Sequence, residues 1–420
     1  MCMQKDNHGT PHPKHRSRRY RMMRNRIIIV TSSVLVICLL TMGLAALLQN
    51  LHPKTAASSG SGSSVSASSA KAETKSSQIT ILGTGDDLIH SSIYKSCATS
   101  SGGYDFRPVY KQIKSNVSAA NVAFVNQETV MAPSVGALSG YPCFNSPTQV
   151  GDALVDTGFD VISQGNNHML DMGQKGLLAT LDYWKSKKGI QVVGAYRNQA
   201  DLDNIRIVEK NGIKTAWIGV VEMTNDISLP SDSPMKIVYT SQRDEIKKLI
   251  TKARSLADVV VVSAHWGEED QYTLSDTEKK LGQDMVDWGA DVILGNHPHV
   301  LQQLTTLTRK SDGAVCPVMY AFGNLISTQR KSQNLVSGQL TVTYKKDEKG
   351  KVTFSGMKFK PSVTYYEAGG QNVHVVMLKD FSNAMAQKSR TWEITSGEFT
   401  PNYAKKVVNK SIPQKYQDWT

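Results

Sequence analysis

Short apolar runs alternate with helix-periodic segments along most of the chain, which is typical of an α/β protein. Runs that predict buried strands lie at 79–82, 122–125, 161–163, 259–262, 292–294 and 318–322. Apolar positions at a period of 3.6 predict helices over 109–119, 177–184, 246–256 and 281–288. Alternating residues around Asn211-Gly212 predict a hairpin, and two more alternating strands flank Lys349-Gly350. Since no internal repeat occurs, this pattern indicates one α/β domain with mixed sheets.

Polar residues with the chemistry of metal ligands follow or end several of these apolar runs. They are Asp86, Glu128, Asn167, His168, His265, His297 and His299. In an open α/β sheet the carboxyl ends of the strands lie along one edge, so loops that are distant in sequence converge there. Carboxylate, amide and imidazole groups together suit a divalent cation, and a set this large predicts one or two ions bridged by a carboxylate.

Each candidate has a purely structural explanation when it is taken alone. Asp86 is suited to capping a helix, Glu128 to the surface, and His265 to a satisfied core position. His297 and His299 flank a proline that favours an extended, exposed loop. It is their joint occurrence at strand ends that favours a metal site over these alternatives.

The amino-terminal part of the chain does not follow the α/β pattern. Residues 1–26 hold eight Lys and Arg against one Asp, which accounts for +7 of the formal net charge of +12. Residues 27–48 are 22 uncharged residues, enough to cross the ~30 Å core of a bilayer as a helix. Basic residues before such a helix keep the amino terminus in the cytoplasm. We therefore expect a single-pass anchor with the main domain outside the cell, rather than a cleaved signal peptide or a nucleic-acid-binding tail.

The remaining chain divides by composition. Residues 49–77 are dominated by Ser, Ala and Gly, which predicts a flexible linker. The α/β pattern spans 78–375, and over the C-terminal extension 376–420 it fades, so this segment either packs on the domain or trails from it. Residues 131–147 are rich in Pro, Gly and Ser and predict a long loop positioned to cover a cleft.

Three of the five cysteines, Cys97, Cys143 and Cys316, lie in the part expected outside the cell. No Cys-x-x-Cys motif supports a thiolate zinc site. In an oxidising exterior we expect Cys97 to pair with Cys143, because both lie in loops rich in Gly, Ser or Pro. The alternative is three unpaired thiols.

Six short motifs occur in one order between Gln78 and Ile326. They are Gly-Asp-x-[Leu/Met], Asn-x-Glu, Gly-Asn-Asn-His-x-x-Asp-x-Gly, His-Trp-Gly-x-Glu, Gly-x-His-Pro-His and Gly-Asn. In this order they resemble the CapA family of poly-γ-glutamate capsule biosynthesis proteins. The resemblance implies a fold related to calcineurin-like metallophosphoesterases, a four-layer α/β/β/α sandwich with two mixed sheets, here preceded by one transmembrane helix.

The resemblance also implies a role for each candidate residue. Asp86 matches the first metal ligand, Glu128 the bridging carboxylate, and Asn167 an amide ligand. His168 matches the acid that protonates a leaving oxygen. The remaining imidazole ligands correspond to His265, His297 and His299.

Two departures from the phosphoesterase pattern affect this site. Where the pattern has Asp-x-His, the chain has Asp86-Asp87-Leu88, so one imidazole is missing and His90 is the candidate substitute. Glu128 stands where the pattern has an aspartate bridge. One metal position is therefore expected to be weak or absent.

The expected function follows from the anchor, the ligand set and the resemblance. We expect a protein that acts in synthesis, export or attachment of an anionic capsule polymer, with Mn, Zn or Fe activating water against a phosphorylated or carboxylated substrate. The alternatives are a scaffold that binds the polymer or its synthase complex, and a general phosphoesterase. The net charge outside the basic tail is small, and no nucleic-acid partner is expected.

Overall fold

The computed structural model describes residues 77–420. The predicted basic tail, the membrane anchor at 27–48 and nearly all of the linker lie outside these residues. Within 77–420 no helix is long and apolar enough to cross a bilayer. The first strand, β1, begins at Ser77, one residue before the expected start of the folded domain.

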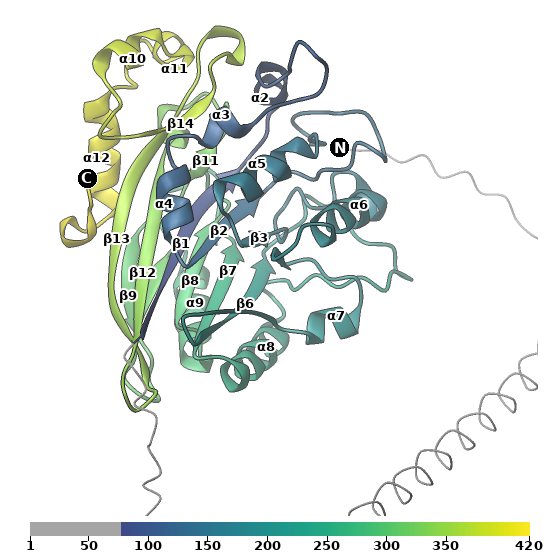
Figure 1. Ribbon diagram of the computed structural model, residues 1–420, viewed down its shortest axis with the longest axis vertical. Helices are drawn as coiled ribbons and strands as arrows, with labels where there is room; N and C mark the ends of the chain where they lie inside the picture. Colours follow the sequence, from purple (N-terminus) through teal and green to yellow (C-terminus); the bar gives the residue numbers. More distant parts are fainter. Residues whose placement is uncertain (1–76) are drawn as a thin grey trace, which may run out of the picture. The chain divides into compact units, whose positions relative to one another are not determined.

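The first sheet has eight strands in the order β14-β13-β12-β1-β2-β3-β4, with β11 beside the end of β1 (Figure 1). Their bounds are β1 (Ser77–Asp87), β2 (Val122–Gln127), β3 (Val161–Ser163), β4 (Gln191–Val193), β11 (Asn324–Ile326), β12 (Val336–Lys346), β13 (Val352–Tyr365) and β14 (His374–Met377). β1 pairs in parallel with β2 and β11, and β2, β3 and β4 continue in parallel. The long strands β12, β13 and β14 pair antiparallel.

The second sheet has six strands in the order β5-β6-β7-β8-β10-β9. Their bounds are β5 (Arg206–Lys210), β6 (Ile213–Val221), β7 (Val259–His265), β8 (Val292–Asn296), β9 (Leu304–Thr308) and β10 (Val315–Met319). The four central strands run parallel, and both edge strands are antiparallel. The α/β class with two mixed sheets is therefore confirmed.

Alternating residues of the second sheet pack on its two faces. Val259 and Val261 join the core between the sheets, whereas Val260 and Val262 face the helices outside, because successive side chains of a strand point to opposite faces. Across the interface the Phe124 ring of β2 stacks on Trp217 of β6 with centroids 5.8 Å apart. The outer face is covered by α8 (Arg243–Leu256) and α9 (Asp276–Trp288).

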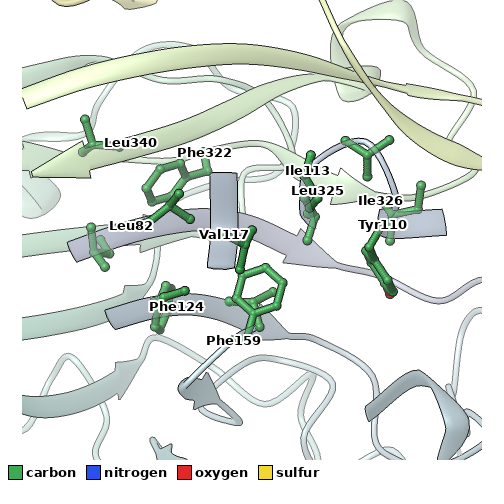
Figure 2. Close-up of a cluster of buried hydrophobic side chains, with 14 of the residues drawn as sticks. Leu82, Tyr110, Ile113, Val117, Phe124, Phe159, Phe322, Leu325, Ile326 and Leu340 are labelled. Carbon is green, nitrogen blue, oxygen red and sulfur yellow. The ribbon is translucent and has the colours of Figure 1, made fainter. Parts of the chain in front are cut away.

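Helices also cover the outer face of the first sheet, as Figure 1 shows for α4 and α5 in front of β1 and β2. The helices outside the second-sheet layer are α2 (Ser91–Ser96), α3 (Arg107–Tyr110), α4 (Lys114–Ala119), α5 (Gln149–Thr157) and α6 (Gly173–Lys185). The short helix α7 (Gln199–Asp203) belongs to the second-sheet layer, because its Leu202 packs in the same cluster as α8 and α9. Ile113 and Val117 point into the cluster that Figure 2 shows around Leu82 and Phe124. The layers therefore run helix, sheet, sheet, helix.

One predicted helix is divided. The segment expected to be helical over 109–119 forms α3 and α4, separated by a turn at Lys111–Ile113. In this turn the Ile113 amide donates to the Tyr110 carbonyl, three residues back, at 3.1 Å. Both Tyr110 and Ile113 are buried against the sheet at this turn.

The C-terminal extension packs on the domain. It contains α10 (Asn383–Lys388), α11 (Arg390–Ile394), α12 (Pro401–Ser411) and a short 3-10 turn at Gln414–Tyr416. Two other 3-10 turns, at Ser332–Leu335 and Ala368–Gly370, precede the extension. Phe399 and Val408 are buried in the core that the first sheet forms. The Ser411 hydroxyl donates to the Leu301 carbonyl at 2.6 Å. Burial of these apolar residues stabilises the docked position of the extension.

The expected disulfide between Cys97 and Cys143 is wrong, because Cys97 is a free thiol. Its side chain, at the end of α2, belongs to the core and not to the exposed loop that the local composition indicated. Burial, together with the nearby Asp105 carboxylate, raises the pKa of Cys97 to about 12. Cys316 is also a free, buried thiol, 3.6 Å from the Arg309 guanidinium.

We expect Gly85→Ala to destabilise the domain. A Cβ atom at Gly85 would lie 1.8 Å from the Gly323 carbonyl oxygen, so β1 and β11 would have to separate and the hydrogen bond from the Asp86 amide to Gly323 would be lost. The free energy of unfolding should fall by roughly 1–3 kcal/mol or more, measured by denaturant titration. Gly282→Ala in α9 is the matched control, since its added methyl meets nothing closer than 3.3 Å; an equal loss in both variants would contradict this explanation.

Candidate metal centre

The carboxyl ends of five strands bring the predicted ligands to one place. β1 ends with Asp86 and Asp87, β2 leads directly into Glu128, and β7 ends with His265. The loop after β3 carries Asn167 and His168, and the loop after β8 carries His297 and His299. All seven candidate side chains are buried, so the surface and loop explanations of these residues do not apply.

Two groups of three ligands share one residue. Glu128, His265 and His297 form the first group, and Asp86, Glu128 and His299 form the second. In each group the ligand atoms lie within 4.8 Å of one another. Glu128 therefore lies where a carboxylate would bridge two cations.

The donor atoms of this cluster suit a divalent cation. Both carboxylate oxygens of Glu128 are buried without a hydrogen-bond partner among residues 77–420. Its Oε1 atom lies 3.8 Å from Nε2 of His265 and 3.7 Å from Nε2 of His299. A buried carboxylate is costly unless it is paired or coordinates a metal. Carboxylate oxygens and imidazole nitrogens within one small space are the ligands expected for Mn, Zn or Fe.

Hydrogen bonds hold Asp86 and His299 in position. The Asn126 amide donates to Oδ1 of Asp86 at 2.7 Å, and the His297 backbone N–H donates to Oδ2 at 3.2 Å. Nδ1 of His299 lies 2.9 Å from Oδ1 of Asn324. An imidazole bonded through one nitrogen has its ring orientation set, so its other nitrogen is directed towards the ligand position.

The loop after β8 has a strained backbone at both ligand histidines. His297 and His299 have φ angles of 103° and 56°, in the region that residues with a Cβ atom rarely adopt. Such conformations cost on the order of 1–3 kcal/mol and cluster at functional sites. Here they turn both imidazoles to the same side of the sheet edge, with ring centroids 6.1 Å apart.

Burial keeps two of the imidazoles neutral. It lowers the pKa of His265 well below its ordinary value and that of His297 to about 3, and neighbouring imidazoles add to both shifts. A neutral imidazole retains the lone pair that binds a metal. Nε2 of His265 lies 3.0 Å from the Asn167 amide oxygen and 3.1 Å from Nδ1 of His297, so these three donors face one point.

The second ligand group, Asp86, Glu128 and His299, favours a positive charge among its side chains. Burial by itself lowers the pKa of His299, but the Glu128 and Asp86 carboxylates outweigh it and raise this pKa to about 10. Burial and the Asp86 carboxylate raise the pKa of Glu128 as well. Both directions have one cause: two buried carboxylates in contact require a proton or a cation between them.

His168 is placed to transfer a proton. Its Nδ1 atom lies 2.8 Å from Oδ2 of Asp171, which leaves Nε2 for a reacting group. Oδ2 of Asp171 also accepts the Phe144 backbone N–H at 2.6 Å. The Phe144 ring meets the His168 imidazole edge-on, with centroids 4.7 Å apart. The loop at 131–147 thus lies over His168, as expected of a loop that covers a cleft.

His90 does not replace the missing imidazole in either ligand group. Its Nδ1 atom lies 3.2 Å from the Leu88 carbonyl and 3.4 Å from the Thr328 amide, and its ring packs edge-on against Phe144. The expectation that His90 substitutes for this ligand is therefore wrong. His90 lies three residues beyond the end of β1, directly before α2.

Sequence reasoning assigned no role to three residues that orient the ligands. Asn126 contacts Asp86 and lies 3.3 Å from Nδ1 of His265, Asn324 contacts His299, and Asp171 contacts His168. Each had a signal in the motifs, because Asn126 begins Asn-x-Glu, Asn324 ends Gly-Asn, and Asp171 follows His168 by three residues. The motifs identified the residue types that bind a metal, but they did not show which neighbouring side chains orient those ligands.

Comparison with known proteins identifies the family of this chain. The model of the family described as "Bacterial capsule synthesis protein PGA_cap" matches residues 80–329. A capsule biosynthesis protein CapA of Bacillus anthracis is 34% identical over 182 residues, covering 42% of each chain. The PGA biosynthesis protein CapA of Bacillus subtilis is 30% identical over 200 residues, covering 47% of this chain and 50% of that protein. The chain thus spans about half the length of the curated relatives it matches.

More distant proteins include a probable polyglutamine synthesis accessory protein of Mycobacterium tuberculosis, 22% identical over 225 residues, or 50% of this chain and 56% of that protein. Among solved structures, an NAD nucleotidase of Haemophilus influenzae has a TM-score of 0.44 at 15% identity, over 82% of this chain and 57% of that one. A TM-score below 0.5 is too low to indicate a reaction. The family match covers more than half of the chain and all seven site residues, and the chain belongs to the bacterial capsule synthesis protein family PGA_cap.

Proposed function

We propose that this chain is a membrane-anchored, extracellular protein that acts on an anionic capsule polymer of the poly-γ-glutamate type through a divalent-metal centre. One observation carries the proposal: the buried Glu128 carboxylate is shared by two groups of metal ligands and has no hydrogen-bond partner among residues 77–420. The names of the Bacillus relatives support the polymer. The reaction is a hydrolysis or transfer at a phosphoryl or carbonyl centre.

The ligand residues would hold the metal in two adjacent positions. Glu128, His265 and His297, with the Asn167 amide oxygen beside them, suit one ion, and Asp86, Glu128 and His299 suit the other. A bound divalent cation supplies Lewis acidity and activates water near neutral pH. The chain's own contribution is to orient the donors and to shield them from bulk water.

His168 supplies the proton for the leaving group in this proposal. Its contact with Asp171 holds the ring in position, with Nε2 left for the leaving group. Asn225 contacts both functional side chains of this loop. Its amide nitrogen lies 3.4 Å from Nδ1 of His168, and its amide oxygen accepts a hydrogen bond from the Asn167 amide nitrogen at 3.3 Å. Phe144 covers the imidazole, so protons are exchanged with the substrate in preference to solvent.

A scaffold without catalytic activity is the second candidate, and one observation favours it. Each ligand group has three members, and His90, which was the candidate for the missing imidazole, lies in neither group. A centre with few ligands binds metal less tightly. In that case the same fold would bind the polymer or its synthase complex, with any metal in a structural role.

We expect the full-length protein, purified with added Mn, Zn or Fe in excess, to bind up to two ions per chain. His297→Ala should lose about half of the metal, because one ligand group remains, whereas Glu128→Ala should lose nearly all of it, because both groups contain Glu128. Elemental analysis measures this. His374→Ala on β14 is the control, being a histidine outside both groups. Full metal content in the Glu128 variant would exclude this centre.

We expect the metal-loaded protein to change the chain length of poly-γ-glutamate, and His168→Ala to lower this rate by about 10²–10⁴-fold with its metal content unchanged. Gel electrophoresis of the polymer and elemental analysis give the two readouts. An active His168→Ala protein would remove the proposed role of this residue. Metal without turnover supports the scaffold, and turnover of simple phosphate esters alone supports a general phosphoesterase.

The anchor at 27–48 predicts the orientation of the protein. Basic residues precede this segment and the linker follows it, so the domain from residue 78 onwards should be digested when intact cells without a wall are treated with protease. The measurement is an immunoblot against the C-terminal extension. Protection of this epitope in intact cells, with digestion only after lysis, would contradict the extracellular location.

A further inference from the structure

A polar cavity of about 740 Å³ lies beside the metal centre. This volume is within the range of about 300–1,000 Å³ that is usual for ligand sites. Residues that line it include His90, Tyr141, Glu269, Arg330, Tyr366 and Arg390. The first three lie within the part that matches the family, residues 80–329, and the last three lie beyond it.

Aromatic contacts connect the cavity with the proton donor. The Phe144 ring packs edge-on against both His90 and His168, with centroids 5.4 and 4.7 Å away, and Tyr141 lies 6.3 Å from Phe144. His90 lines the cavity, whereas His168 belongs to the metal centre. One aromatic side chain therefore separates the two spaces.

Glu269 marks the same boundary from the other side. It is the glutamate of the His-Trp-Gly-x-Glu motif, four residues after His265, and it lines the cavity. Besides burial and Asp86, its carboxylate contributes to the raised pKa of Glu128. Since Glu269 is only four residues from the ligand His265, this part of the cavity lies near the end of β7.

Two arginines are among the residues that line the cavity. Arg330 follows β11 and is exposed, and Arg390 begins α11 with a side chain 40% exposed. Tyr366 holds the two segments together, since its hydroxyl donates to the Gln329 carbonyl at 2.8 Å and its own carbonyl accepts the Arg390 amide at 2.9 Å. Burial raises the pKa of Tyr366, and both guanidinium groups oppose this shift, so both lie near its ring.

We propose that this cavity is the polymer-binding cleft, in which Arg330 and Arg390 bind successive carboxylates of a γ-linked glutamate chain and direct it to the metal centre. A guanidinium binds a carboxylate through two parallel hydrogen bonds, which gives orientation as well as affinity. Two such groups that line one cavity favour an extended polyanion over a single small anion. The inference rests on the proposed function and adds the residues that select the substrate.

The ion pair between Arg390 and Glu393 affects how tightly the cleft binds the polymer. Arg390 contacts the Glu393 carboxylate, which is largely exposed. A polymer carboxylate must compete with Glu393 for this guanidinium. Removing the charge of Glu393 should therefore strengthen binding, while removing the charge of Arg390 should weaken it, which gives two substitutions on one short helix with opposite expected effects.

The test is equilibrium binding of a fluorescently labelled γ-linked glutamate oligomer to the full-length protein, followed by anisotropy at constant ionic strength. We expect Arg330→Gln and Arg390→Gln each to raise the Kd by roughly tenfold, and Glu393→Gln to lower it. Arg243→Gln on α8 is the matched control, because this arginine has a similar exposed fraction, 37%, and its own carboxylate partner, Asp284. Unchanged binding in both cleft variants, or equal weakening in the control, would overturn the proposal.

Two further measurements separate this inference from the proposed function. The metal content of the arginine variants should equal that of the unmodified protein, because neither residue belongs to a ligand group. A protein that binds metal but not the oligomer would refute the cleft and leave the centre in place, whereas arginine-dependent binding without any metal would refute the centre and leave the cleft. Equal displacement of the oligomer by inorganic polyphosphate of the same charge would overturn selection for carboxylates.

Discussion

Face-to-face packing of the two sheets is the constraint on which the site depends. The carboxylates come from the first sheet and the imidazoles from the second, so no ligand group exists within either sheet alone. Phe124 stacked on Trp217, and Leu294 against Gly83, set the relative position of the strands. Since protein cores are closely packed, a shift of one sheet would be resisted throughout the interface. Because the ligands lie at the ends of these strands, the packing of the sheets also fixes the distances between them.

The site is also costly to build, and its cost points to a bound cation. Two carboxylates and three imidazoles are buried together, two histidines occupy unusual backbone conformations, and the Glu128 oxygens lack hydrogen-bond donors among the described residues. Burying charge without compensation is strongly unfavourable. If these positions served stability alone, apolar residues would be favoured there. The buried carboxylates and imidazoles are therefore better explained by a function of the site.

The C-terminal part of the chain contributes residues to the lining of the cavity. Strand β13, the turn at Ala368–Gly370 and helix α11 bring Tyr366 and Arg390 to the same cavity as residues of the matched region. Gly370 lies close to Ser92, where an added Cβ would come within 2.5 Å. In this arrangement the shared part of the fold carries the ligands, and the part outside the family match shapes the cavity in front of them.

Much of this protein was determined by local sequence. Strand and helix periods indicated the α/β class, and polar residues directly after strands identified Asp86, Glu128, Asn167 and the four histidines, because strand ends share one edge whatever the rest of the fold does. The sequence also indicated the apolar segment at 27–48.

Tertiary structure alone decided which side chains meet. Cys97 belongs to the core and forms no disulfide, and His90 packs on Phe144 and not against a ligand. Neither outcome can be read from composition or spacing, because each depends on the direction in which a loop leaves its strand. The bridging position of Glu128 and the cavity beside it have the same origin: both are made by residues more than one hundred positions apart, whose separation is set by the packing of the two sheets and the docked C-terminal extension.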